Sequence, residues 1–122
     1  MADARLRVLL VEDEALISLL LQDMLDELDC EVADMSANLD EALLAARTGS
    51  FDLALLDLSL GKKLTYPVAD ILKARQIPFA FVTGYGAADL DPSHAGIAVL
   101  AKPFRLKDLQ TIIAQVVPGR SS

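Results

Sequence analysis

The sequence contains few of the residues that would tie it to nucleic acid, membranes or an oxidising compartment. It has no tryptophan, one cysteine, and 11 basic residues against 18 acidic ones, which gives a formal net charge of -7. Because DNA, RNA and anionic lipids are bound through basic surfaces, this charge disfavours all three as partners. Cys30 has no second cysteine in the chain with which to form a disulfide, which is typical of a reducing compartment.

Long hydrophobic runs are also missing. No run reaches the roughly 18 apolar residues needed to span a bilayer, and residues 1–5 lack the apolar stretch of a secretion signal. We therefore predict a cytoplasmic location. The length of 122 residues suits one domain, with a core at about 5–117 and a tail at 118–122. The high hydrophobic content, 53% with only 5% aromatics, predicts an aliphatic core.

Short apolar runs alternate with helical patterns along the chain. The runs cover residues 5–11, 31–35, 51–57, 78–84 and 96–102. Apolar periodicity, capping residues and prolines predict helices at about 14–29, 38–49, 67–77 and 104–117. Unbroken apolar strands separated by helices are typical of parallel sheets that are covered on both faces. The sequence therefore predicts an α/β fold, a doubly wound parallel sheet of five strands with helices on both faces.

The helical patterns differ in strength. The first helix has the most regular apolar stripe, formed by Leu16, Ile17, Leu20, Leu21, Met24, Leu25 and Leu28. The crossover between Gly84 and Gly96 is the weakest, since it offers only Ala87, Ala88 and Leu90 to the core and Pro92 interrupts any helix of ordinary length. We expect one or two poorly packed turns there. Switching segments are drawn from regions of low local stability, although a short helix without a role is the alternative.

Polar residues follow the apolar runs at their carboxyl ends. These ends together hold Glu12, Asp13, Asp57, Thr83 and Lys102. In a parallel sheet alternating with helices, all carboxyl ends lie at one edge, so these side chains are expected to share one pocket. Clustered carboxylates repel one another unless a cation intervenes, and carboxylate oxygens suit Mg²⁺. The arrangement therefore indicates a magnesium site and the handling of phosphoryl groups.

Each of these residues has an ordinary explanation when it is taken alone. Asp13 is a suitable helix cap, and Glu12 and Asp57 are acceptable as solvated loop acids. Thr83 beside a glycine fits a turn, and Lys102 fits a lysine that covers apolar surface with its stem. Only their joint placement at the strand ends favours a functional site.

The same positions resemble the receiver domain of bacterial two-component response regulators, over about residues 5–117. The motifs are Glu12-Asp13 after the first strand, Asp57 after the third, Thr83 after the fourth and Lys102-Pro103-Phe104 after the fifth. The resemblance implies the flavodoxin-like strand order 2-1-3-4-5. It also implies that Asp57 is the phosphoacceptor.

Further roles are implied by the resemblance alone. Glu12, Asp13, Asp57 and the backbone carbonyl of Ser59 would hold Mg²⁺. Thr83 would sense the phosphoryl group and Lys102 would pair with it. The Lys102-Pro103 peptide bond is at a position that is often cis in the family. The chain would take part in its own Mg²⁺-dependent phosphorylation and dephosphorylation without being an enzyme for other substrates.

The chain departs from the common receiver pattern at the switch. Many receivers have Tyr or Phe three residues before the lysine, where this chain has Val99. The segment 81–85 (FVTGY) instead resembles the F-A-T-G motif of a stand-alone receiver subclass, with Val82 in place of the alanine. We predict a switch formed by Thr83, Gly84 and Tyr85, in which glycine frees the backbone. Simple coverage of the core by Tyr85 is the alternative.

The implied function is that of a stand-alone regulator that switches partner binding when Asp57 is phosphorylated. The phosphodonor would be a histidine kinase, of the HWE or a related type, or a histidine phosphotransfer protein. A downstream protein target would be reached through the weak crossover and the last helix. A receiver fragment of a larger regulator would have the same sequence.

Other classes fit less well. A haloacid-dehalogenase-like phosphatase requires an Asp-x-Asp pattern, which Asp57-Leu58-Ser59 lacks. A flavodoxin-like binding module needs a loop rich in Ser, Thr or Gly after the first strand, where this chain has acidic residues. A degenerate receiver that acts as a docking module without phosphorylation is the stronger alternative.

Overall fold

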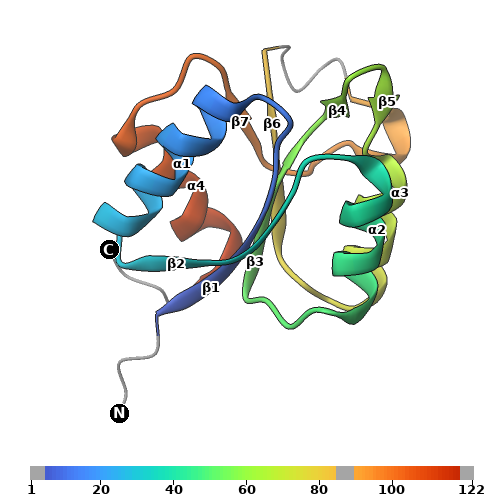
Figure 1. Ribbon diagram of the computed structural model, residues 1–122, viewed down its shortest axis with the longest axis horizontal. Coiled ribbons are helices and arrows are strands. Elements are labelled where there is room, and N and C mark those ends of the chain that lie inside the picture. Colours follow the sequence, from blue (N-terminus) through green and yellow to red (C-terminus); the bar gives the residue numbers. More distant parts are fainter. Residues whose placement is uncertain (1–4, 85–89, 119–122) are drawn as a thin grey trace.

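A parallel sheet forms the centre of the computed structural model, which describes residues 5–84 and 90–118 (Figure 1). Its strands are β1 (Leu6–Val11), β2 (Cys30–Ser36), β3 (Leu53–Asp57), β6 (Phe79–Thr83) and β7 (Val99–Ala101). They lie in the order β2-β1-β3-β6-β7 and all pair in parallel. The predicted fold class and the predicted order 2-1-3-4-5 are confirmed.

Helices cover both faces of this sheet. Helices α1 (Ala15–Glu27) and α4 (Leu106–Val116) lie on one face, and α2 (Leu39–Thr48) and α3 (Tyr66–Ala74) lie on the other (Figure 1). Neighbouring strand residues point to opposite faces, so Val8 packs with α1 and α4 while Leu9 packs with α2 and α3. This is why the central strands β3 and β6 are apolar up to their last residue. Within the described ranges, no helix is long and apolar enough to cross a bilayer.

The start of α2 follows the predicted capping pattern. The Asn38 side chain accepts a hydrogen bond from the backbone N–H of Glu41 at 2.9 Å, and the Glu41 carboxylate accepts one from Ala37 N at 3.1 Å. Two donors of the first turn are thus satisfied by side chains. The helix ends at Gly49, as predicted.

The stripe predicted for α1 is wrong at its first turns. Leu21 and Leu25 are fully buried, but Leu16 is 80% exposed and Leu20 is 41% exposed, and Leu19 is exposed as well. At about 100° per residue, Leu16 and Leu19 lie on the face of the helix opposite to Leu21. The sheet covers one narrow side of α1, so the additional leucines remain at the surface.

Two very short strands were not predicted. The loop after β3 contains a hairpin of β4 (Ser59–Leu60) and β5 (Lys63–Leu64), which pair antiparallel. Gly61, in the turn, has a φ of +62°, a conformation that glycine adopts without steric cost. Strands of two residues are too short to give an alternating pattern, so the sequence indicated only a loop here.

The weak crossover is better packed than predicted where it is described. It contains a 3-10 turn, η2 (Pro92–His94), and both Leu90 and His94 are buried. The predicted inward position of Leu90 is confirmed, and the prediction of poor packing is wrong at His94. A histidine is not counted in an apolar pattern, yet its ring can be buried when its nitrogens have partners. The predicted inward residues Ala87 and Ala88 lie outside the described residues.

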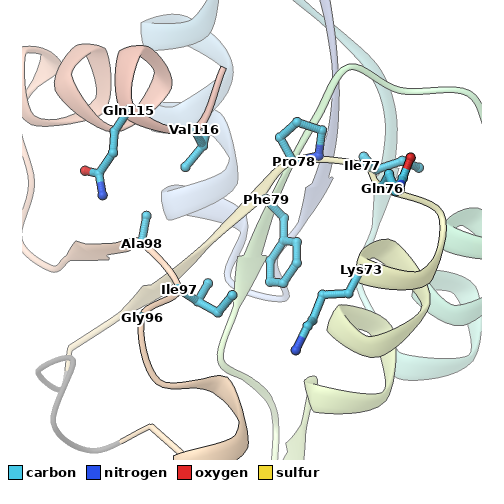
Figure 2. A pocket seen from close by; sticks show the side chains of 10 residues that line it. All are labelled: Lys73, Gln76, Ile77, Pro78, Phe79, Gly96, Ile97, Ala98, Gln115 and Val116. Carbon is cyan, nitrogen blue, oxygen red and sulfur yellow. The ribbon is translucent and has the colours of Figure 1, made fainter. Parts of the chain in front are cut away.

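A hollow of about 430 Å³ lies at the amino-terminal edge of the sheet (Figure 2). It is lined by the end of α3, the start of β6, the chain before β7 and the end of α4. Among the described residues that line it, Lys73 is the only charged one, and the remainder are apolar or amide side chains and a glycine. The hollow has no cluster of groups for phosphoryl chemistry, which all lie at the opposite edge.

Candidate functional site

The carboxyl edge of the sheet brings the predicted polar residues together. Glu12 and Asp13 follow β1, Asp57 ends β3 and Thr83 ends β6. Lys102 follows β7, and its backbone N–H donates to the carbonyl of Thr83 at 2.8 Å, which aligns the ends of β6 and β7. All five positions therefore lie at one edge of the sheet.

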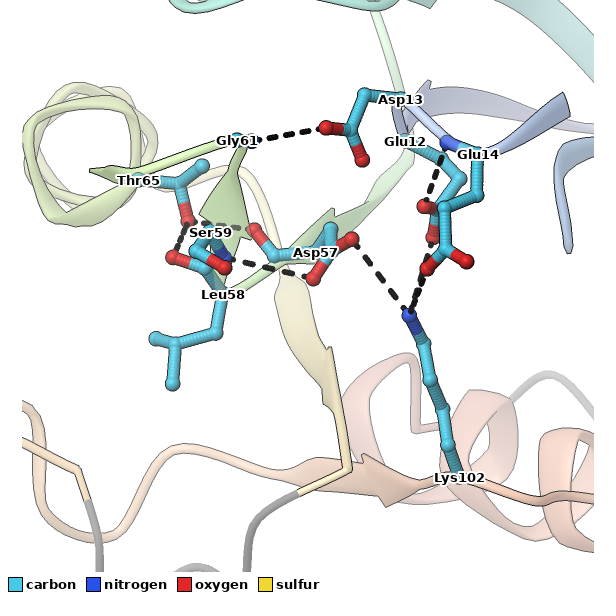
Figure 3. A network of polar contacts seen from close by, with 9 residues as sticks. All are labelled: Glu12, Asp13, Glu14, Asp57, Leu58, Ser59, Gly61, Thr65 and Lys102. Carbon is cyan, nitrogen blue, oxygen red and sulfur yellow. Dashed lines mark hydrogen bonds and ion pairs between the residues drawn. The ribbon is translucent and has the colours of Figure 1, made fainter.

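Three carboxylates form the centre of this site (Figure 3). One oxygen each from Glu12, Asp13 and Asp57 lies within 4.8 Å of the others. Glu12 and Asp57 are buried, with 5% and 7% exposure, whereas Asp13 lies at the surface. Such crowding of negative charge is unfavourable without a neighbouring cation.

Lys102 supplies one positive charge. Its Nζ lies 3.6 Å from Asp57 Oδ2 and 3.7 Å from Glu12 Oε1. Burial lowers the pKa of this ammonium group, but the negative charges of Asp57 and Glu12 outweigh the effect and hold the pKa above its usual value. Lys102 therefore remains charged and bridges the carboxylates from the β7 side (Figure 3).

Glu14 is a member of the site that the sequence did not indicate. Its carboxylate lies 3.4 Å from Lys102 Nζ, and its backbone N–H donates to Glu12 Oε2 at 3.1 Å. The side chain is largely exposed. An acidic residue just before a helix is indistinguishable in sequence from a solvated one, so only the position of Lys102 identifies it.

Glu12 has an unusually high affinity for a proton. Burial raises the pKa of its carboxyl group, and so does the adjacent Asp57, whereas the Glu14 N–H and Lys102 lower it; the net result is a pKa of about 7 instead of 4.5. Glu12 therefore holds a proton more readily than an ordinary glutamate. Whether the Glu12 carboxyl group is ionised therefore depends on which cation lies next to it.

The β4–β5 hairpin holds the outer side of the pocket. Gly61 N donates to Asp13 Oδ2 at 2.8 Å, and Ser59 N approaches Asp57 Oδ1 at 3.4 Å. The same hairpin carries the Ser59 carbonyl that was predicted as a metal ligand. A hollow of about 470 Å³ beside Asp13 is bordered by this hairpin, with Lys62 and Lys63, and by the start of α2.

Thr65 is a second residue that the sequence did not indicate. It is fully buried, and its hydroxyl donates to the backbone carbonyl of Asp57 at 2.7 Å. The carbonyl of Leu58, at 3.1 Å, is its other acceptor (Figure 3). A single threonine at the end of a loop gives no periodic signal in the sequence. Its hydroxyl can be buried because these two carbonyls are its hydrogen-bond partners.

The switch residues are only partly described. Thr83 is buried at 3% exposure, and Val99 has no aromatic ring to move. Gly84 does not have a positive φ, and a Cβ atom built on it would contact none of the described residues within 4 Å. Glycine is therefore not required at this position by the conformation in the structure. Tyr85 lies outside the described residues. The Lys102–Pro103 peptide bond is cis, in agreement with the prediction.

The donor set suits a hard divalent cation. Glu12 Oε1 is buried and has no hydrogen-bond partner among the described residues, and the ammonium of Lys102 lies 3.7 Å from it. Buried polar atoms are normally satisfied, so an oxygen of this kind beside two further carboxylates indicates a position for a cation. Mg²⁺ binds through a few carboxylates while it keeps several waters. The exposed side of Asp13 leaves room for those waters.

The fold and this edge of the sheet define the class of protein. The chain matches the model of the response regulator receiver domain over residues 8–114, and it belongs to that family. Receiver domains are signalling modules of two-component systems, and they bind Mg²⁺ at an acidic pocket such as this one.

Known proteins show the extent of the similarity. PdtaR, a transcriptional regulatory protein of Mycobacterium tuberculosis, is 33% identical over 107 residues, 84% of this chain and 52% of PdtaR. The solution structure of SdrG from Sphingomonas melonis has a TM-score of 0.83 and 35% identity, covering 94% of this chain and 98% of that one.

A third similar structure includes the metal. The receiver domain of the sensor histidine kinase PA1611 from Pseudomonas aeruginosa has Mg²⁺ coordinated in its active site cleft. It has a TM-score of 0.76 and 27% identity, over 93% of this chain and 98% of that one. This chain spans about half the length of the curated relatives that it matches.

Proposed function

We propose that this chain is a single-domain response regulator that accepts a phosphoryl group on Asp57 from a histidine kinase or a histidine phosphotransfer protein. A kinase of the HWE or a related type is the proposed donor. Phosphorylation then changes the affinity of the chain for a downstream protein target. SdrG supports the single-domain assignment, because 98% of its chain is covered by this one.

One observation carries the proposal. The Asp57 carboxylate lies at the end of β3, with the Lys102 ammonium 3.6 Å away and with one oxygen each of Glu12 and Asp13 within 4.8 Å of its own. A nucleophilic oxygen is thus placed beside both a fixed cation and a candidate metal site. This is the charge arrangement that phosphoryl transfer requires, since its catalysis is mainly positioning and electrostatic stabilisation.

The chemical step needs little from the protein beyond the nucleophile. An Asp57 carboxylate oxygen attacks the phosphorus of a phosphohistidine, a P–O bond forms and the P–N bond breaks, and the imidazole nitrogen keeps the electron pair. Mg²⁺, held by Glu12, Asp13, Asp57 and the Ser59 carbonyl, would neutralise charge on the transferred group. Later attack of water on the phosphorus returns the carboxylate and releases inorganic phosphate.

Lys102 and Thr83 act on the phosphorylated residue. A phosphoryl group adds about -1.5 to -2 of charge and three acceptor oxygens. Lys102 Nζ, already 3.6 Å from Asp57, pairs with that charge. The Thr83 hydroxyl, at the end of the adjacent β6, donates to a phosphoryl oxygen, and its movement alters the surface that follows β6.

The exposed leucines of α1 support a protein partner on the donor side. Leu16, Leu19 and Leu20 are 80%, 57% and 41% exposed and lie within two turns of Glu14, which contacts Lys102. Clusters of exposed apolar residues beside a site are typical of protein interfaces. A donor that covers α1 would bring its phosphohistidine to Asp57. The surface that contacts the downstream target is proposed on the weak crossover and α4.

Two alternatives remain distinct from this proposal. A degenerate receiver would use the same fold for docking and would not be phosphorylated. A receiver fragment of a larger regulator, as in PdtaR, of which this chain matches about half, would be phosphorylated in the same way. Phosphorylation of the chain separates the first alternative from the proposal, and the length of the protein in its native cell extract separates the second.

The test is phosphoryl transfer to the purified chain. We expect acetyl phosphate with Mg²⁺, or a phosphorylated histidine kinase of the source organism, to add one acid-labile phosphate, measured by intact mass. Asp57→Asn removes the addition, whereas Asp23→Asn, an exposed aspartate on α1, retains it. Phosphate on Asp57→Asn excludes this acceptor. No phosphate on the wild-type chain with any donor favours the docking module.

A further inference from the structure

His94 is a buried titratable residue that the proposed chemistry does not use. It is the single histidine in the sequence and is 4% exposed. Its Nε2 lies 2.9 Å from Asp70 Oδ1 on α3, and its Nδ1 lies 3.0 Å from Ser93 Oγ. The carboxylate of Asp91 is 3.8 Å from Nδ1. Both ring nitrogens have partners, so η2 is attached to α3 through this imidazole.

Tyr66, at the start of α3, makes a second set of contacts with η2. Its ring stacks on His94 with centroids 4.4 Å apart and 23° between the planes. Its hydroxyl accepts a hydrogen bond from Asp91 N at 2.8 Å. The ring also meets Phe81 of β6 edge to face, at 5.7 Å. One aromatic side chain thus contacts both η2 and the strand that ends at Thr83.

Thr65 connects Tyr66 to the phosphoacceptor. It precedes Tyr66 directly, and its buried hydroxyl donates to the Asp57 carbonyl at 2.7 Å. Its backbone N–H also donates to Leu58 O at 2.9 Å. The start of α3 is therefore attached to the last residue of β3 by bonds that do not involve Thr83.

We propose that Thr65 and Tyr66 form a second route from Asp57, which ends at His94 on the crossover turn η2. The inference rests on the proposed phosphorylation of Asp57 and goes beyond it, since it assigns a transmitting role to two residues outside the acidic pocket. Thr65 and Tyr66 are positioning residues, because neither contacts the carboxylate that reacts. A displacement of the Asp57 backbone moves the start of α3, and Tyr66 transfers the movement to Asp91 and His94.

The route takes the place of an aromatic switch residue that this chain lacks. An aromatic ring three residues before Lys102 is replaced by Val99, so a ring that moves at that position is not part of this chain. Tyr66 contacts β6 through Phe81 and contacts η2 through His94 and Asp91. It therefore receives changes from both β3 and β6, and packed elements of this kind have discrete arrangements that transmit small shifts.

Since the chain has a single histidine, its imidazole gives one assignable NMR probe for the route. We expect beryllofluoride with Mg²⁺, or phosphorylation, to shift the His94 Hε1 resonance of the wild-type chain at constant pH. Thr65→Val keeps the shape of the side chain but removes the hydroxyl, and Tyr66→Phe removes the acceptor for Asp91 N. Each variant is expected to reduce the shift by about half or more.

Controls separate this role from general destabilisation. Thr65→Ser retains the hydroxyl and should restore the His94 shift, and Thr111→Val removes an exposed hydroxyl that bonds Lys107 O at 2.9 Å and should leave it unchanged. Intact mass reports phosphorylation of Asp57 separately in the wild type and in each variant, so a wild-type chain without phosphate counts against the proposed function and not against the route. In the resting protein, Thr65→Val should speed exchange of the Asp91 amide about threefold or more. A full His94 shift in phosphorylated Thr65→Val and Tyr66→Phe, or unchanged Asp91 exchange in resting Thr65→Val, overturns the proposal.

Discussion

The ammonium of Lys102 lies 3.6 Å from the carboxylate of Asp57, and it lies almost equally close to Glu12, at 3.7 Å. One lysine thus offsets two buried carboxylates. Removal of one partner from such a group is costlier than the attraction alone suggests, because charge is left behind in a partly desolvated position.

Lys102→Met should lower both stability and phosphorylation. Without the ammonium, Asp57 and Glu12 repel each other, and we expect a loss of about 1–3 kcal/mol in the free energy of unfolding at pH 8 without Mg²⁺, less than for fully buried pairs. Urea unfolding measures this loss. Lys107→Met, on the exposed side of α4, is the control and should change stability by less than about 0.5 kcal/mol. Equal stability of the two variants would show that Lys102 does not offset the carboxylates.

The raised pKa of Glu12 predicts that the stability of the metal-free protein depends on pH. Its pKa is about 7 in the folded chain against an ordinary value of 4.5, so the neutral form stabilises the fold. That contribution is fully present below about pH 4.5 and is lost as pH rises through 7. Between pH 5.5 and 8 we expect Glu12 to account for a loss of about 1–3 kcal/mol of unfolding free energy.

Glu12→Gln is the control for this dependence. Glutamine has a similar shape but does not ionise, so the difference in stability between wild type and variant should grow with pH, in favour of the variant. Saturating Mg²⁺ should reduce the difference, since the cation favours ionised Glu12. Parallel stability curves for the two proteins from pH 5.5 to 8 would contradict the raised pKa.

The sequence predicted the sheet and most of the pocket for one reason. Strands buried on both faces are largely apolar, so the polar residues at their carboxyl ends stand out, as Asp57 does at the end of β3. Parallel topology then places these ends together. The five residues predicted from strand ends all lie at that edge in the structure.

Residues outside this rule were not predictable. Thr65 and His94 are polar residues in irregular segments, and each is buried because a specific hydrogen bond satisfies it. Such bonds join residues far apart in sequence and leave no local pattern. The error at Leu16 and Leu20 is the opposite one: both were predicted to face the core and both are exposed, because hydrophobicity alone does not reveal which side of α1 the sheet covers.

Asp13→Asn should separate metal binding from hairpin structure. In the wild type, Gly61 N donates a hydrogen bond to Asp13 Oδ2 at 2.8 Å. The side-chain oxygen of asparagine can still accept this bond, but one negative charge is lost. We expect the fold to persist, the Mg²⁺ affinity to fall at least about tenfold and phosphorylation to be abolished. Asp40→Asn, which borders the same hollow from α2, is the control. Mg²⁺ titration followed by amide NMR measures affinity, and wild-type affinity in Asp13→Asn would remove Asp13 from the metal site.

Gly84→Ala tests the predicted switch after Thr83. In the resting structure this glycine lacks a positive φ, and a Cβ would meet nothing within 4 Å in the part of the chain that the structure describes, so we expect stability within about 0.5 kcal/mol of wild type. Gly61→Ala is the contrasting variant, since a φ of +62° should cost it about 1 kcal/mol.

Any effect of Gly84→Ala must then arise in the phosphorylated state. We expect phosphorylation to slow amide exchange from Leu90 to Ala95 in the wild type, and Gly84→Ala to reduce that slowing because the activated backbone needs a conformation that alanine resists. Exchange that slows equally in both phosphorylated proteins would exclude Gly84 from the switch and leave the route through Thr65 and Tyr66.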